Sequence, residues 1–322
     1  MTGRLVHLKF GWQETAASSP HPGPSRSGMV DYLQFVLAPQ MLNGLSFGIA
    51  IVLMALGLTI IFGLLDVINM AHSEFFALGA YGGFVLTAAG FNFWVAMAIV
   101  PILMLPLGAL TERLLVRRVF DSPDRHTLTL LLTLGLSMIV VDLLKLHFGP
   151  NPVKPETPIS GGIELFGVFL PAYRMFLIVL GAAIIGAVYV IIYRTNIGAM
   201  IRAAAWDRNM ASSLGVPVST VYSATFAFGT ALAALAGVLL APIFSVFPTI
   251  GHDFIVLAFT VVIVGGMGSI KGAVLAGILL TQIQAITSLI ISPIWTDPIL
   301  FGIMVLVLMF RPQGLFGKLG QA

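Results

Sequence analysis

The side chains best suited to chemistry gather in one short segment, residues 66–76, between two long apolar stretches. Ionisable and amide side chains are costly beside so much apolar sequence, so they are expected to line a pathway, pair with each other or stabilise a bend. We interpret the segment as a broken helix beside a substrate pathway; the alternative is a polar turn that joins two helices. The pathway residues predicted here are Asn69, Ala71, His72, Ser73 and Glu74.

Other chemistry is limited by what the sequence lacks. His72 and Glu74 are too small a set for a metal site, and we expect none. Asp66, His72 and Glu74 would form the proton relay if the chain were an ion-coupled secondary transporter, which is a rival hypothesis. The chain has no cysteine, which excludes disulfides, thiolate metal sites and cysteine nucleophiles. A His-Glu-x-x-His motif and paired catalytic carboxylates are also missing from the apolar stretches, so we expect neither enzyme activity nor a catalytic residue.

The composition of the whole chain sets the environment of these polar residues. Of the 322 residues, 58% are hydrophobic and 9% are charged, and the mean hydropathy is +1.02. Soluble domains carry roughly 25% charged residues, so the chain is expected to be an integral membrane protein. Its net charge of +3 comes mostly from Lys and Arg in short loops. This charge therefore indicates membrane topology and contact with lipid, and no nucleic-acid partner is expected.

Charge-free stretches fill the chain, and a helix needs about 20 apolar residues to cross a bilayer. Dividing these stretches at polar, Pro and Gly residues predicts an all-α polytopic membrane protein with eight to ten transmembrane helices. Residues 29–320 would form one transmembrane domain, and residues 1–28 a disordered extension. A tenth helix would lie at 30–40. The nine segments expected to be helical are 41–65, 74–90, 93–112, 127–146, 173–193, 218–241, 253–270, 272–291 and 297–310.

Two basic loops determine the expected orientation, because cytoplasmic loops are enriched in Lys and Arg. Residues 113–125 carry four arginines and residues 194–208 carry three, so both loops are expected on the cytoplasmic side. The loop at 147–172 is then expected outside. The side of the N-terminus stays open, because a single span at 41–65 would leave basic residues before it on the outer face.

Residues 196–217 have the pattern of a short amphipathic helix outside the membrane, ended by Gly215 and Pro217. A polar face favours docking of a cytosolic protein; the alternative is a helix in the bilayer interface, anchored by Trp206. The polar face comprises Arg202, Asp207, Arg208 and Asn209. The glycine-rich residues 265–272 lack the Gly-Lys-Ser/Thr of a phosphate loop, so we expect a break between two helices there.

Seven short motifs spread between residues 29 and 317 carry a resemblance to one family. They are Asn43–Leu45, Gly57–Gly63, Ile68–His72, Leu78–Tyr81, Gly198–Gly215, Gly265–Ser269 and Arg311–Gly317. Together they resemble the permease subunits of branched-chain amino acid ABC importers, the LivH type. Two positions depart from the family pattern: Ser73 stands where the family usually has Gly, and Lys271 where it often has Pro.

This resemblance implies a multi-pass permease of the bacterial inner membrane that forms half of a pore and translocates branched-chain or other hydrophobic amino acids. The same family moves urea and short amides, so these substrates are alternatives. ATP would be bound by separate ATP-binding-cassette ATPase subunits, and this chain would need no cofactor. A second related permease subunit and a periplasmic substrate-binding protein would complete the system. The loop at 195–217 would sit in a cleft of the ATPase. The residues expected to couple the two are Gly198, Arg202, Ala203, Asp207, Ala211, Leu214 and Gly215.

Overall fold

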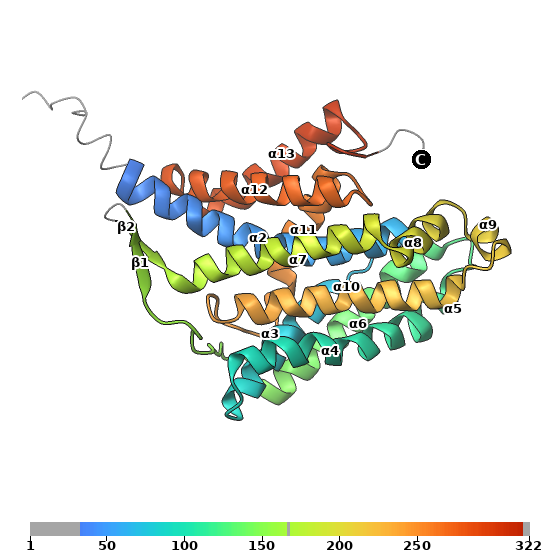
Figure 1. Cartoon of the computed structure of the whole chain (residues 1–322), viewed down its shortest axis with the longest axis horizontal. Helices are drawn as coiled ribbons and strands as arrows, with labels where there is room; N and C mark the ends of the chain where they lie inside the picture. Colours follow the sequence, from blue (N-terminus) through green and yellow to red (C-terminus); the bar gives the residue numbers. More distant parts are fainter. Residues whose placement is uncertain (1–32, 166–167, 318–322) are drawn as a thin grey trace, which may run out of the picture.

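The computed structural model describes residues 33–165 and 168–317. In this part of the chain, long helices lie side by side along the longest axis of the molecule (Figure 1). They are α2 (Ala38–Leu65), α3 (His72–Ala88), α4 (Phe93–Thr111), α6 (Arg125–Phe148), α7 (Ala172–Arg194), α10 (Val218–Leu240), α11 (Ile250–Gly265), α12 (Ile270–Ile290) and α13 (Thr296–Phe310). The shorter elements are η1 (Leu33–Leu37), η2 (Glu112–Val116), α5 (Arg117–Val119), β1 (Gly162–Leu165), β2 (Val168–Pro171), α8 (Asn196–Trp206), α9 (Arg208–Ser213) and η3 (Pro293–Trp295).

Each of the nine predicted spans coincides with one long helix of the described residues, which confirms the all-α membrane fold. The tenth helix expected at 30–40 is not a separate element. Residues 35–65 form one apolar helix of 31 residues, because no polar turn interrupts them and Pro39 lies in the first turn, where proline is tolerated. Residues 30–32, like the extension predicted at 1–28, lie outside the described residues.

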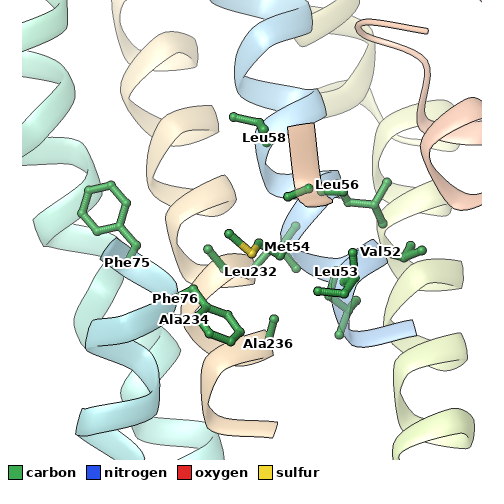
Figure 2. Packing of buried hydrophobic residues seen from close by; sticks show 14 of the residues in the cluster. Val52, Leu53, Met54, Leu56, Leu58, Phe75, Phe76, Leu232, Ala234 and Ala236 are labelled. Atoms are coloured by element: carbon green, nitrogen blue, oxygen red, sulfur yellow. The ribbon is translucent and has the colours of Figure 1, made fainter. Parts of the chain in front are cut away.

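The centre of the bundle is formed by α2 and α10, with α3 packed against them. In the most apolar windows of α2 and α10, 89% and 78% of the residues are buried, against 22–28% in α4, α6 and α7. Figure 2 shows this core, in which Met54 of α2 lies near Leu232 of α10 and Phe76 of α3. The outer helices expose Leu, Ile and Val, the side chains that a membrane protein presents to lipid or to a neighbouring subunit.

Two glycines let α3 and α10 approach each other at backbone distance. A Cβ atom on Gly79 would overlap the backbone of Ala234, and a Cβ atom on Gly237 would overlap the carbonyl oxygen of Phe76. Small residues allow such close contacts between helices in lipid, where dispersion attraction drives helix association. This contact keeps the N-terminal half of α3 in the interior of the bundle.

The two ends of the bundle differ (Figure 1). The elements α5, α8 and α9 lie at one end, and the antiparallel hairpin of β1 and β2 lies at the other. At the first end Arg208 forms an ion pair with Asp121 at 3.0 Å, which joins the two basic loops. Both loops therefore share one end of the bundle, the end that the arginines predict to be cytoplasmic. The first helix, α2, begins at the opposite end, beside the hairpin.

The glycine-rich segment separates α11 from α12, as predicted. Gly266 and Gly268 have φ angles of +101° and +78°, which glycine adopts without strain. The C-terminal motif packs on this break: the backbone N–H of Leu315 donates to the Val264 carbonyl at 2.8 Å. The segment also lies against Gly63, near the end of α2. The end of α11 is therefore anchored at the cytoplasmic end of the bundle.

Candidate functional site

The chain turns back into the bundle after α2. Asp66, directly after α2, has a left-handed backbone (φ 52°), and helical structure resumes only at His72. His72 is fully buried, and its Nε2 lies 3.1 Å from the carbonyl oxygen of Met54. Met54 precedes the end of α2 by eleven residues, which is about 17 Å of helix. Helix α3 thus begins about 17 Å from the end of α2, inside the bundle, and residues 66–71 lead the chain from the exposed Asp66 into the interior.

Side chains and neighbouring helices satisfy the backbone of this element. Asn69 Oδ1 accepts the N–H of Ala71 at 3.1 Å, and Thr133 Oγ1 of α6 accepts the N–H of Met70 at 3.0 Å. Because no water reaches lipid-exposed backbone, irregular structure at this depth is tolerated only when protein groups bond to it. The buried Thr133 and the equally buried Ser137, one turn further along α6, provide a polar stripe on that helix.

Glu74 is the centre of a polar cluster drawn from three helices. Its Oε1 accepts hydrogen bonds from Ser137 Oγ of α6 at 2.9 Å and from Ser73 Oγ at 3.2 Å. His252, in the first turn of α11, places Nε2 3.4 Å from the same oxygen and 3.2 Å from Ser137 Oγ. Glu74 is fully buried, and its Oε2 has no hydrogen-bond partner among the described residues. The carboxylate therefore keeps one free acceptor inside the bundle.

The structure does not bring together the three residues of the rival proton relay. Asp66 is exposed and pairs with Arg125 at 2.9 Å, whereas His72 contacts the backbone of α2 and Glu74 contacts α6. Within the described residues, no hydrogen bond connects Asp66, His72 and Glu74. The geometry needed for proton transfer among them is not present in this conformation.

The predicted amphipathic helix at 195–217 is instead two helices, α8 and α9. The break lies at Asp207, whose backbone is extended and whose side chain accepts the N–H groups of Asn209 at 2.8 Å and Met210 at 2.9 Å. An aspartate is a favoured helix N-cap because it satisfies these free N–H groups. Asp207 therefore ends α8 and starts α9.

The expected polar face is largely used inside the chain. Arg202 donates to the carbonyl oxygen of Ile192 at the end of α7, and Arg208 pairs with Asp121 and lies over the Phe120 ring at 4.9 Å. Carbonyl groups at a helix end need donors, which explains the position of Arg202.

Of the other predicted coupling residues, Gly198 packs on the last carbonyls of α7 and Ala211 is buried. Ala203 and Gly215 are exposed, the latter with φ +85°. Three large apolar side chains of this region are also exposed: Trp206, Met210 and Leu214 are 76%, 62% and 78% exposed.

Comparison with known proteins assigns the family. The family described as the permease component of the branched-chain amino acid transport system matches residues 40–309. The chain belongs to this permease family.

Three relatives illustrate the match. The permease protein LivH of Salmonella typhimurium is 31% identical over 87% of this chain and 95% of its own length. The permease protein BraD of Pseudomonas aeruginosa is 30% identical with the same coverage. LivM of Escherichia coli is 27% identical over 82% of this chain and 67% of its own length. All three are named as high-affinity branched-chain amino acid transport system permease proteins.

The permease is thus a multi-pass subunit of an ABC import system in the bacterial inner membrane and not an enzyme, with ATP hydrolysis in separate subunits. Its site contains two residues that the sequence interpretation missed, Ser137 and His252. A single serine in an apolar helix gives no signal. A signal existed for His252, because His252 and Asp253 are the only His, Asp, Glu, Lys or Arg residues between Arg208 and Lys271.

A second polar cluster ties the cytoplasmic ends of α4 and α10 together. Glu112 of η2 is buried (1% exposed), and its Oε2 accepts from Arg117 at 2.7 Å and from Ser223 Oγ of α10 at 2.7 Å. Arg117 also donates to Ser219 Oγ at 2.6 Å. Beside this cluster, a cleft of about 690 Å³ opens between α5, α9 and the start of α10. The hydrogen bonds of the Glu112 cluster therefore hold α4 and α10 together at the cytoplasmic end, next to the exposed apolar side chains of α8 and α9.

Proposed function

We propose that this permease translocates branched-chain amino acids through a pore that it forms with a second, related permease subunit. Two ATP-binding-cassette ATPases at the cytoplasmic end bind ATP and drive the transport, and a periplasmic substrate-binding protein delivers the amino acid. The substrate is supported by the names of relatives that match nearly the whole chain. The match to LivM as well as to LivH supports pairing with a related subunit.

The observation that carries the proposal is the exposed apolar surface of α8 and α9. Trp206, Met210 and Leu214 are large exposed apolar side chains of α8 and α9, which lie at the end of the bundle opposite the β1–β2 hairpin. Exposed apolar patches rimmed by polar residues are typical of protein interfaces. We assign this surface, including Ala203 and Gly215, to contact with the ATPase.

The remaining coupling residues hold this surface in place. Gly198 and Arg202 fasten α8 to the end of α7, Asp207 sets the angle between α8 and α9, and Ala211 packs inward. Because α9 leads within a few residues into α10, a push from a closing ATPase pair would reach the centre of the bundle as a rigid-body movement.

Asn69, Ala71, His72, Ser73 and Glu74 pack behind the surface of the translocation pathway in this proposal. All side chains of the predicted set are buried, so in this conformation they position the pathway and do not contact the substrate. Ala71 provides close packing, Asn69 and His72 hold the broken helix, and Ser73 holds Glu74. Glu74 is the member of the set that contacts His252, which is partly exposed.

The test is co-purification of the permease with its ATPase from native membranes. Leu214→Asp places a charge on a side chain that is 78% exposed, and we expect the recovered ATPase to fall at least about tenfold because a buried unpaired charge opposes docking. Ile294→Asp is the matched control: Ile294 is 81% exposed but lies in η3, which precedes α13 on the outer side. Equal recovery from both variants would overturn the docking assignment.

A further inference from the structure

Helix α11 exposes two ionisable side chains that the predicted pathway does not include. The side chain of His252 is 48% exposed and Asp253 is exposed, although both lie in a helix that has no other ionisable side chain. Behind them is the fully buried Glu74, whose free Oε2 lies against Gly251. His252 therefore contacts a buried carboxylate on its inner side and is open on its outer side, next to the exposed Asp253.

Two independent helices place this point near the middle of the membrane. Helix α11 ends at Gly265 on the cytoplasmic side, and Asp253 lies twelve residues earlier, about 18 Å along the helix. His252 contacts Ser137, which lies midway along α6 between the cytoplasmic Arg125 and the outer Phe148. The hydrocarbon core is about 30 Å thick, so both estimates put His252 and Asp253 close to its centre.

Charged side chains at this depth face water or protein and not lipid. Ionisable residues within membrane segments are costly, and they face the interior of a bundle or a water-filled cavity. His252 and Asp253 are open in the single chain, so their surface must be covered by an aqueous pathway or another subunit.

The side of α11 that carries His252 and Asp253 continues toward the cytoplasm with Val256, which is 43% exposed, and then with the half-buried Phe259 and Ile263. The spacing of these residues keeps them on one side of α11. The two ionisable side chains lie next to the apolar residues on the same side of α11. This arrangement suits a substrate that has one charged end and one apolar end.

We infer that His252 and Asp253 line the translocation pathway at mid-membrane, and that the Asp253 carboxylate binds the ammonium group of a zwitterionic amino acid in transit. The inference rests on the proposed function for the nature of the substrate. Glu74 is a positioning residue here, because it holds His252 at the pathway through the contact at 3.4 Å. The apolar side chain of the amino acid passes along Val256 and Phe259.

The natural absence of cysteine makes a direct test available. Asp253→Cys is introduced as the only cysteine of the assembled transporter, if necessary after replacing cysteines of the partner subunits, and is treated in membranes with a charged, membrane-impermeant methanethiosulfonate. A thiol reacts as the thiolate, which forms in water and not in hydrocarbon, so we expect labelling at least about tenfold faster than for Ile102→Cys. Ile102 is 62% exposed midway along α4, on an apolar face, and serves as the control at similar depth.

Two outcomes decide the inference. Faster labelling of Asp253→Cys than of Ile102→Cys supports the pathway; equal rates overturn it. If Asp253→Cys does not reach the membrane, Val256→Cys, one turn away on the same face, takes its place with the same criterion.

Measurements of leucine uptake distinguish a failure of this inference from a failure of the proposed function. Asp253→Asn is expected to lower leucine uptake at least about tenfold, because the ammonium loses its counter-charge in the pathway. Asp142→Asn, an exposed carboxylate near the outer end of α6 beside Lys145, is expected to leave uptake unchanged. Loss in both variants, or in neither, contradicts the role of Asp253. Failure of the unmodified complex to take up leucine, with Asp253→Cys still labelled faster, would refute the substrate and leave the pathway in place.

Discussion

Glu74 is buried among hydrogen-bond donors, and it also contacts His252, which lies in the proposed translocation pathway. A buried carboxylate is stable only when donors replace the water it has lost. Ser137 and Ser73 supply two donors to Oε1. The other oxygen remains without a partner in the described structure.

Ser137→Ala tests whether the Ser137 hydroxyl stabilises the buried Glu74 carboxylate. Removing the Ser137 hydroxyl leaves Glu74 with one donor fewer, and we expect a loss of about 1–3 kcal/mol in the free energy of unfolding. The measurement is thermal or denaturant unfolding of the detergent-solubilised permease. Ser213→Ala removes an exposed hydroxyl bonded only to its own helix and should change stability by less than about 0.5 kcal/mol. Similar stability of the two variants would show that Ser137 does not support Glu74.

Some residues of this site can be predicted from the sequence, and others cannot. Asn69, His72 and Glu74 stand out because polar types are rare beside long apolar stretches, and the structure places them at a broken helix. Ser137 could not be predicted, because a serine in an apolar helix commonly bonds to its own backbone and only the fold brings it to Glu74. His252 and Asp253 interrupt a long charge-free stretch, but their depth follows only from where α11 begins and ends.

At the scale of elements, the two helices α8 and α9 replace the single predicted helix. The alanines of 203–205 favour helix throughout, but aspartate suits both a helix surface and an N-cap, and the sequence alone does not distinguish these roles. The distinction matters, because as a cap Asp207 shapes the docking surface, whereas as a surface charge it would pair with the ATPase.

Two substitutions at Asp207 separate these roles. Asn caps a helix about as well as Asp, so Asp207→Asn should keep leucine uptake near its normal level. Asp207→Ala loses the cap, at a cost of about 1 kcal/mol, and should weaken both ATPase co-purification and uptake. If both variants lose uptake equally, the charge of Asp207 and not its capping is what coupling requires.

At the scale of the whole molecule, the nine helices and the cytoplasmic side follow from the sequence, because long apolar stretches and arginine-rich loops are strong signals. The pairing of helices does not follow. Small residues at Gly79 and Gly237 indicate that each helix packs closely, but not that α3 and α10 pack on each other. The tenth helix was expected because it would place the N-terminal basic residues on the inner side and because residues 30–65 are too long for one straight crossing. The structure has one helix of 31 residues instead, and helices accommodate such a mismatch by tilting.

The central claim is that this permease is driven by ATP through partner subunits and not by an ion gradient. The most direct measurement is leucine uptake into proteoliposomes that contain the permease, its partner permease and the ATPases, with ATP enclosed and the binding protein outside. Leucine uptake is expected to require enclosed ATP and to be unaffected by a protonophore. Uptake that proceeds without ATP under a pH gradient and is abolished by the protonophore would contradict it.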